Sequence, residues 1–418
     1  MPCMKTLADN IPMHEKRQSL RVLYLHPAAA FGGASKSLIE LFCSFPEQQV
    51  QATVLCPSGQ AAEQFRKAGM QVIECVGLSQ WDNTRFGYYR GKRWLILLRE
   101  LMLWPLTYSK LLSVSRHGRF DLIHANEITL LPTAIYAQRI LKAPLVIHVR
   151  SLQRLPNSSP VTNWVNGMLA MAQAVIAIDR TVARALPEHL DAVVIHNGIR
   201  LTESMKAMPR SMERPMHVAM VGGLLRMKGV YEFVEAAKIC RDRGLNIKFL
   251  LAGENPRNLK GISKWALEWL GLAHDVRSDL EQYIKQNNLG GMVKLLGFVS
   301  DVNAFYKEID LLCFPSHLDA AGRPVFEAAF HGVPALVAAE NPEPDTVING
   351  ETGLCIAPRN PAAIADALEY LSDNRGRLAL LGENARRLAM EHFDNAQNAK
   401  QVLELYRHAI TTFSSNVA

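Results

Sequence analysis

One segment, from residue 309 to residue 358, constrains the fold of this chain more than any other. It reads IDLLCFPSHLDAAGRPVFEAAFHGVPALVAAENPEPDTVINGETGLCIAP. The apolar run Ile309–Phe314 predicts a short buried strand, and a polar loop follows it. Pro324 suits the first position of a helix and Gly332 its C-terminal cap, after which the apolar sequence VPALVA predicts a second strand. The loop therefore lies at the carboxyl end of a strand, where open α/β sheets bind ligands.

The helix predicted to start at Pro324 offers chemistry suited to an anion. Its first N–H groups have no partner within the helix, and its dipole places positive charge at this end. We expect Glu327 in the first turn, where its carboxylate would accept hydrogen bonds from sugar hydroxyls, and Asp319 in the loop. In the alternative, Glu327 only complements the helix dipole and Asp319 is a solvated loop acid. Spacing alone favours this alternative, because acids are common at helix starts.

The whole segment resembles the donor-binding signature of glycosyltransferase family 4. These are retaining enzymes with the GT-B fold, in which two Rossmann-like domains face each other across a cleft. The matching residues are Pro315-Ser316, Glu327, Gly332-Val333-Pro334 and the turn Asn349–Gly353. The family signature has two glutamates with seven residues between them, and Asp319 stands at the first position. Aspartate keeps the charge of that glutamate but is one methylene shorter.

Length and cysteine usage set the outer bounds. A chain of 418 residues fits two domains of about 200 residues each. Its seven cysteines are dispersed and show no paired metal-ligand spacing, which predicts reduced thiols in a cytoplasmic protein and no zinc or iron–sulfur site. Residues 1–19 are charged and lack an apolar core, so we expect a flexible tail there and not a signal peptide.

Charge is distributed unevenly along the chain. Residues 1–209 carry 23 Lys and Arg against 14 Asp and Glu, whereas residues 210–418 carry 23 against 25. A basic half suggests an anionic partner surface, either lipid headgroups or nucleic acid. Of the two we expect an anionic membrane surface, contacted through residues 82–116, and no nucleic acid partner.

Residues 82–116 mix basic and aromatic residues with a long apolar stretch. The basic residues are Arg85, Arg90, Lys92, Arg93 and Arg99, and the aromatic residues among them are Phe86, Tyr88, Tyr89 and Trp94. Charges and Pro105 interrupt the apolar stretch, which makes it a poor transmembrane span. One interpretation is a helix buried on the face of a domain. The other is an interfacial segment that enters an anionic membrane surface.

Residues 20–200 read as a first domain with a parallel sheet covered by helices. Strands are predicted at residues 20–26, 51–57, 70–76, 120–127, 143–150, 175–179 and 193–196. Gly32 and Gly33 follow the first strand and precede a helix, so the backbone there can approach a ligand closely. The resemblance implies that this glycine loop faces the donor phosphates and that His148 contacts the transferring sugar. A lone histidine is otherwise more often structural.

A second domain is predicted at residues 216–393, after a linker at residues 201–215. Arg226 and Lys228 lie at the start of a predicted helix beside a glycine turn, which suits a diphosphate; the alternative is two surface cations. In the family an arginine follows the first glycine of this turn; here Gly223 takes that position, and Arg226 is the candidate replacement.

Three further expectations concern this half of the chain. Residues 255–280, with Trp265 and Trp269 four residues apart, form an insertion that is a lid, an acceptor contact or a packed cover. The exit of the strand at residues 293–299, including Val299, meets the nucleotide base. Residues 394–418 form a helix that crosses back to the first domain.

The resemblance implies a hexosyltransferase that moves a sugar from a nucleoside diphosphate sugar to a glycan or lipid-linked acceptor, without a metal or cofactor. The catalytic residues would be His148, Asp319 and Lys228. The donor-binding residues would be Gly32, Gly33, Arg226, Lys228, Val299, Asp319, Gly322, Arg323, Pro324, Val325 and Glu327. Two alternatives stay open: a sugar-nucleotide epimerase on the same fold, and a catalytically weak sugar-nucleotide-binding protein. We expect a cytoplasmic protein that associates peripherally with the inner face of the membrane.

Overall fold

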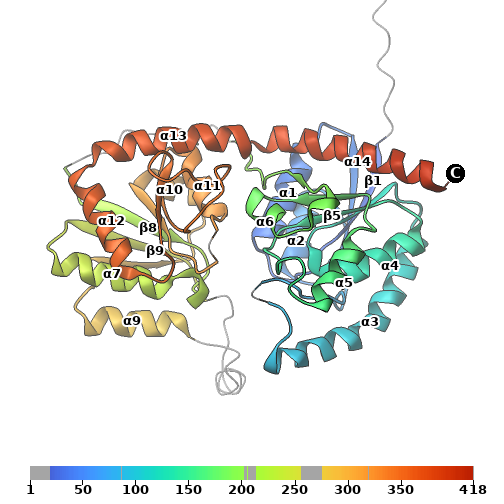
Figure 1. Cartoon of the computed structure of the whole chain (residues 1–418), viewed down its shortest axis with the longest axis horizontal. Coiled ribbons are helices and arrows are strands. Elements are labelled where there is room, and N and C mark those ends of the chain that lie inside the picture. Colours follow the sequence, from blue (N-terminus) through green and yellow to red (C-terminus); the bar gives the residue numbers. More distant parts are fainter. Residues whose placement is uncertain are drawn as a thin grey trace, which may run out of the picture.

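The computed structural model describes residues 19–85, 87–201, 205, 213–255, 275–318 and 320–417, which form two α/β domains side by side (Figure 1). The predicted architecture of two Rossmann-like domains is confirmed. Several sequence expectations lie outside the described residues: those for Asp319 and Phe86, for most of the linker, for Trp265 and Trp269, and for residues 1–18.

The first domain is built on a seven-stranded parallel sheet in the order β3-β2-β1-β4-β5-β6-β7. Its strands are β1 Leu20–Leu25, β2 Val50–Pro57, β3 Gln71–Cys75, β4 Leu122–Ala125, β5 Leu145–Val149, β6 Ala174–Ala177 and β7 Val193–Val194. Successive residues of β1 point to opposite faces: Val22 and Tyr24 enter one core, and Leu23 and Leu25 the other. A strand buried on both faces must be apolar throughout, which is why these runs are readable in the sequence.

Six helices accompany this sheet. They are α1 Gly33–Ser44, α2 Gln60–Lys67, α3 Trp94–Ser115, α4 Leu131–Leu141, α5 Pro160–Leu169 and α6 Arg180–Arg184.

The second domain repeats the design with a six-stranded parallel sheet in the order β10-β9-β8-β11-β12-β13. Its strands are β8 Met216–Val221, β9 Ile247–Ala252, β10 Val293–Gly297, β11 Leu311–Phe314, β12 Ala335–Ala338 and β13 Gly353–Ile356. Its helices are α7 Val230–Asp242, α9 Val276–Gln286, α10 Val302–Glu308, α11 Arg323–Phe330, α12 Pro361–Asp373 and α13 Gly376–His392. The strand order reverses beside β1 in one sheet and beside β8 in the other, and ligands bind at such points.

The last helix, α14 (Asn395–Val417), returns to the first domain. Figure 1 shows α13 and α14 running in succession along one edge of both domains. The apolar side chains of α14 join the first-domain core, and its buried Tyr406 lies within hydrogen-bond distance of Tyr24 Oη (3.2 Å) and His124 Nδ1 (2.7 Å). The chain therefore crosses between the domains twice.

Two predicted helix starts are wrong by a few residues. Arg226 and Lys228 do not begin a helix but form a 3₁₀ turn, and α7 follows after Gly229. Gly229 has a φ of 79°, and a Cβ there would lie 1.9 Å from the main-chain oxygen of Pro315, so only glycine fits. Helix α11 begins at Arg323, because Gly322 is extended and caps it. Glu327 is therefore in the second turn and not the first.

Candidate functional site

A cavity of about 460 Å³ lies between the two domains. The carboxyl ends of β1, β4 and β5 lead to its first-domain wall, and those of β8 and β11 to its second-domain wall. Its polar lining includes Ser37, Thr84, Glu127, Arg150, Ser151, Asp179 and Asn197 from the first domain, and Lys228, Ser316 and Arg323 from the second. The points at which the strand order reverses in the two sheets therefore both face one cleft.

Lys228 provides a cation on the second-domain wall. Its side chain is half-buried, with Nζ 5.5 Å from the centroid of the Phe314 ring. Burial lowers the pKa of this ammonium group. No carboxylate of the described residues forms an ion pair with it, so it is available to an anion in the cleft.

The first turn of α1 forms part of the opposite wall, where Gly33 and Ala34 line the cavity. His26 and Asn126, at the ends of β1 and β4, fix this turn. Asn126 Nδ2 donates to His26 Nδ1 (3.0 Å) and to the main-chain oxygen of Ala34 (3.2 Å). Because Nδ1 of His26 is then the acceptor, its Nε2 donates to Ser35 Oγ (3.0 Å). The helix start is therefore rigidly presented to the cleft.

A network of charges connects α1 to α11 across the cleft. Glu327 Oε1 accepts from Lys36 Nζ (2.6 Å) and from Arg323 Nε (2.8 Å), and Tyr306 Oη donates to Oε2 (3.2 Å). Arg323 also donates to Ser37 Oγ at 2.9 Å, and it pairs with Glu40 of α1. Burial alone would raise the pKa of Glu327, but Arg323 and Lys36 outweigh it and hold that pKa below its ordinary value. The carboxylate is therefore ionised and fully engaged.

Arg150 forms the centre of the first-domain wall, and His148 lies behind it. Arg150 Nε donates to both the main-chain and side-chain oxygens of Asn126 (3.1 Å each), and Nη1 donates to Asn197. Nη2 lies 3.2 Å from His148 Nδ1. His148 is only 3% exposed and does not line the cavity, and burial followed by the charge of Arg150 holds its pKa well below its ordinary value. In this structure Arg150, not His148, faces the cleft.

Glu127 follows β4, lines the cavity and acts electrostatically on Arg150. Its Oε1 accepts from Ser151 Oγ (2.8 Å) and from the main-chain N–H of Ile128 (2.9 Å). Burial raises the pKa of this carboxyl, although the hydrogen bonds from Ser151 and Ile128 act in the other direction. Such a group is suited to contact a hydroxyl of a sugar or an acceptor.

The predicted site residues divide into two groups. Gly33, Lys228, Gly322 and Arg323 line the cavity. Gly32, His148, Arg226, Val299, Pro324, Val325 and Glu327 do not. Arg226 is exposed, with its guanidinium carbon 5.6 Å from the centroid of the Tyr231 ring. The N–H groups expected at the start of α11 are fewer than predicted, because Pro324 has none and that of Val325 donates to Gly322.

Sequence reading missed Arg150, Glu127 and Lys36. Arg150 and Glu127 end the predicted strand segments at residues 143–150 and 120–127, so their position at the carboxyl edge of a sheet was a usable signal. Lys36 had no such signal, because its partner is 291 residues away in the other domain.

A second contact between the domains lies near the cleft. Asp345 Oδ2 accepts from the main-chain N–H of Arg180 (3.1 Å) and lies 2.8 Å from His196 Nε2. Asp179 caps α6 by accepting from the N–H of Val182 (2.7 Å). Burial, and then the negative charge of Asp345, raise the pKa of Asp179 to about 6.

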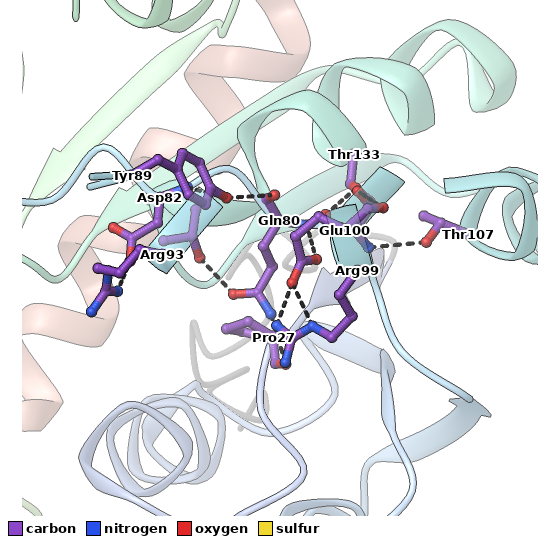
Figure 2. A network of polar contacts seen from close by, with 11 residues as sticks. Pro27, Gln80, Asp82, Tyr89, Arg93, Arg99, Glu100, Thr107 and Thr133 are labelled. Carbon is purple, nitrogen blue, oxygen red and sulfur yellow. Dashed lines mark hydrogen bonds and ion pairs between the residues drawn. The ribbon is translucent and has the colours of Figure 1, made fainter. Parts of the chain in front are cut away.

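Helix α3 buries polar and apolar residues together on its inner side, Glu100 and Thr107 beside Leu111 and Val114, and leaves many apolar side chains exposed. Figure 2 shows Glu100 pointing inward, where its Oε2 accepts from the N–H of Gln80 (2.8 Å). Thr107 Oγ1 accepts from the N–H of Ser79 (3.0 Å), whose main-chain oxygen accepts from Thr133 (2.7 Å) (Figure 2). These hydrogen bonds, made by Glu100 and Thr107, attach α3 to the loop after β3.

The outer side of α3 is apolar and exposed. Its exposed apolar side chains are Trp94, Leu95, Leu98, Leu101, Met102, Leu106, Tyr108 and Leu112. The interpretation of residues 82–116 as a helix buried on the domain face therefore holds only for the inner side of α3, where Leu111 and Val114 join the first-domain core. Within the described part of the chain, no helix combines the length and apolar character that crossing a bilayer requires.

Comparisons with known proteins agree with this geometry. Residues 31–203 match the family described as "Glycosyltransferase Family 4", and residues 202–388 match "Glycosyl transferases group 1". Glycogen synthase of Mycobacterium tuberculosis is 23% identical over 93% of this chain and 94% of that protein. The capsular polysaccharide biosynthesis glycosyltransferase CapM of Staphylococcus aureus is 26% identical over 43% of this chain, and the match spans only 42% of CapM.

Solved structures show the same fold. Anabaena Alr3699/HepE, in complex with UDP and glucose, superposes with a TM-score of 0.71 at 20% identity, over 92% of this chain and 98% of that one. Sucrose-phosphate synthase from Thermosynechococcus elongatus gives a TM-score of 0.68 at 17% identity, over 94% of this chain and 100% of that one. Two adjoining family matches, together with two facing parallel sheets, lead to one assignment: the chain is a glycosyltransferase of the GT-B fold, related to family 4.

Proposed function

We propose that the cleft transfers a sugar from a nucleoside diphosphate sugar to a hydroxyl acceptor with retention of anomeric configuration. The observation that carries this proposal is the half-buried Lys228, which has no ion-pair partner among the described residues, in a cavity between two sheet edges. A diphosphate there would be neutralised by Lys228 and by the helix starts at Gly33 and Gly322. UDP and glucose in the complex of Anabaena HepE support a donor of this class.

In the proposed reaction the bond between the anomeric carbon and the diphosphate oxygen breaks, and its electron pair stays on the diphosphate. The acceptor oxygen forms the new bond on the same face of the sugar, and its proton passes to the departing diphosphate. Lys228 stabilises the charge that develops on the diphosphate, a task that needs no metal ion. Glu327 is proposed to hold the ribose, and Asp319 and His148 to contact the sugar. The contact of His148 requires Arg150 to move aside.

We further propose that the protein acts at the inner face of a membrane, on a lipid-linked or glycan acceptor. The exposed apolar side of α3 supports a peripheral contact, because such residues insert at the acyl boundary. Exposed Arg90, Arg99 and Arg116 flank this side and suit anionic headgroups. Thr84, on the loop that leads to α3, lines the cavity, so α3 lies within one loop of the cleft.

The test begins with a panel of nucleotide sugars and thermal unfolding. A donor at 100 times its dissociation constant should add about 2.7 kcal/mol to the free energy of unfolding. Products formed with and without an acceptor are then analysed by NMR. A new glycosidic bond in the donor's anomeric configuration supports the proposal, and an inverted product contradicts it. A sugar-nucleotide epimerase would change the donor without an acceptor, and a binding protein would change nothing.

A further inference from the structure

Arg150 is a cation in the cleft with no counter-ion among the described residues. It follows β5, is half-buried and lines the cavity. Its hydrogen-bond partners are Asn126, Asn197 and His148, none of which carries a negative charge. Glu127 acts on it electrostatically but forms no ion pair with it. The positive charge of Arg150 is therefore uncompensated by direct contact.

The hydrogen bonds of Arg150 leave part of the guanidinium free. An arginine has five N–H groups. Nε–H is shared between the two oxygens of Asn126, one N–H of Nη1 goes to Asn197, and one of Nη2 goes to His148. One N–H on each terminal nitrogen has no partner in the described part of the chain. A fixed fork with free donors is the arrangement that binds phosphate or carboxylate oxygens.

The surroundings of Arg150 favour an anion over a neutral ligand. Two helix starts, at Gly33 and Gly322, and the ammonium group of Lys228 line the same cavity. Asn126 connects the guanidinium directly to the first turn of α1, because its side chain also holds Ala34. A partly buried cation without a counter-ion costs free energy. A protein that keeps one in a substrate cleft gains from it when the anion arrives.

We infer that Arg150 binds a phosphate oxyanion of a substrate from the first-domain wall, opposite Lys228. The inference rests on the proposed function, since it concerns the same cleft. The oxyanion belongs either to the diphosphate of the donor or to a phosphate group on the acceptor. Asn126 is a positioning residue in this arrangement, because it holds the fork without reaching the ligand. The hydrogen bond between Arg150 and His148 is the one that breaks when His148 contacts the sugar.

The test compares the wild type with Arg150→Gln, which removes the charge, and Arg150→Lys, which keeps it. UDP, GDP and ADP are titrated by calorimetry, and the tightest is compared with its nucleoside. If Arg150 binds the donor, Arg150→Gln should bind the diphosphate roughly 10- to 100-fold more weakly and the nucleoside equally well. If it binds the acceptor, diphosphate affinity stays the same, and inorganic phosphate no longer binds to the nucleotide-saturated protein. Arg150→Lys should recover part of either loss.

Unchanged affinity of Arg150→Gln for both the nucleoside diphosphate and inorganic phosphate would overturn the inference. A purely structural arginine would instead lower the midpoint of thermal unfolding without separating diphosphate from nucleoside. If Arg150→Gln does not fold, the wild type is treated with phenylglyoxal and Arg150 modification is followed by mass spectrometry. Protection by the nucleoside diphosphate or by inorganic phosphate supports the inference, and no protection by either overturns it.

The outcomes for Arg150 and for the proposed function are separate. If no nucleoside diphosphate binds the wild type, the proposed function fails, while phosphate protection of Arg150 still decides this inference. If a nucleoside diphosphate binds and Arg150→Gln behaves as the wild type, only the inference about Arg150 fails.

Discussion

Lys36 Nζ lies 2.6 Å from Glu327 Oε1, so a cation of α1 neutralises a carboxylate of α11 across the cleft. If Glu327 holds the donor ribose, Lys36 already binds the carboxylate oxygen that would accept a hydrogen bond from the ribose. The ion pair must then break before the donor binds. The free energy of breaking it weakens the observed affinity for the donor. The contact therefore acts as a competitor of the donor and as a link between the domains.

Lys36→Met should accordingly bind the nucleoside diphosphate more tightly. The Lys36 side chain is 41% exposed, and pairs of this kind contribute up to about 1 kcal/mol, so we expect a gain of at most about fivefold. Calorimetric titration measures it. Lys67→Met, at an exposed position of α2, is the matched control. Weaker binding in Lys36→Met than in Lys67→Met would show that Lys36 supports the donor-bound state.

The positions of the strands along the chain were readable in the sequence, while the contacts between domains were not. Strands such as β1 and β5 are buried on both faces, and this forces continuous apolar runs. The site residues Gly33, Lys228 and Gly322 were predictable because they follow predicted strands, at the sheet edge where open α/β sheets bind ligands. The pairing of Lys36 with Glu327 depends on how two separate domains are oriented, which no local pattern encodes.

The orientation of helix α3 could not be predicted for a different reason. Burial of apolar residues is the ordinary expectation, and the sequence of α3 is mostly apolar. The structure buries Glu100 and Thr107 because the loop at Ser79 and Gln80 offers them hydrogen bonds. Which side of such a helix faces inward depends on that loop. Its N–H groups at Gln80 and Ser79 lie 20 and 28 residues before their partners Glu100 and Thr107.

Membrane binding is predicted to depend on the basic residues next to α3. Arg90→Ser, Lys92→Ser and Arg93→Ser together should release the protein from anionic vesicles at low salt, because each such cation contributes about 1 kcal/mol near the surface. Vesicle co-sedimentation measures this. The matched control replaces exposed Lys285, Lys294 and Lys400 by Ser. Equal retention of both triple variants on the vesicles would contradict the proposed membrane contact.

Asp179 should make stability depend on pH. Burial, and then Asp345, raise its pKa in the folded protein to about 6, above the unfolded value of 3.8. The folded state therefore holds this proton more tightly, and the stability it contributes is complete below about pH 4 and is lost as pH rises through about 6. Relative to Asp179→Asn, the free energy of unfolding of the wild type should fall by up to about 3 kcal/mol over that range.

Denaturant unfolding between pH 4 and pH 7.5 measures this difference. Asparagine can still cap α6, so the substitution removes the charge and keeps the hydrogen bond to Val182. Asp301→Asn is the matched control, because Asp301 caps α10 from an exposed position. If both variants differ from the wild type by the same pH dependence, burial of Asp179 is not its cause.

Lys228 and Glu327 should affect catalysis in different ways. Lys228 faces the proposed diphosphate, whose negative charge grows as the glycosidic bond breaks, so its contact is stronger in the transition state than in the ground state. Lys228→Ala should lower turnover at saturating donor by roughly 10²–10³, the usual effect of removing one preorganised charge stabiliser. Glu327, on the ribose, is remote from that charge, so Glu327→Gln should mainly raise the Michaelis constant for the donor. Initial rates over a range of donor concentrations separate the two effects. Equal losses of turnover in the two variants would reject this division of roles, and wild-type turnover in Lys228→Ala would reject the site.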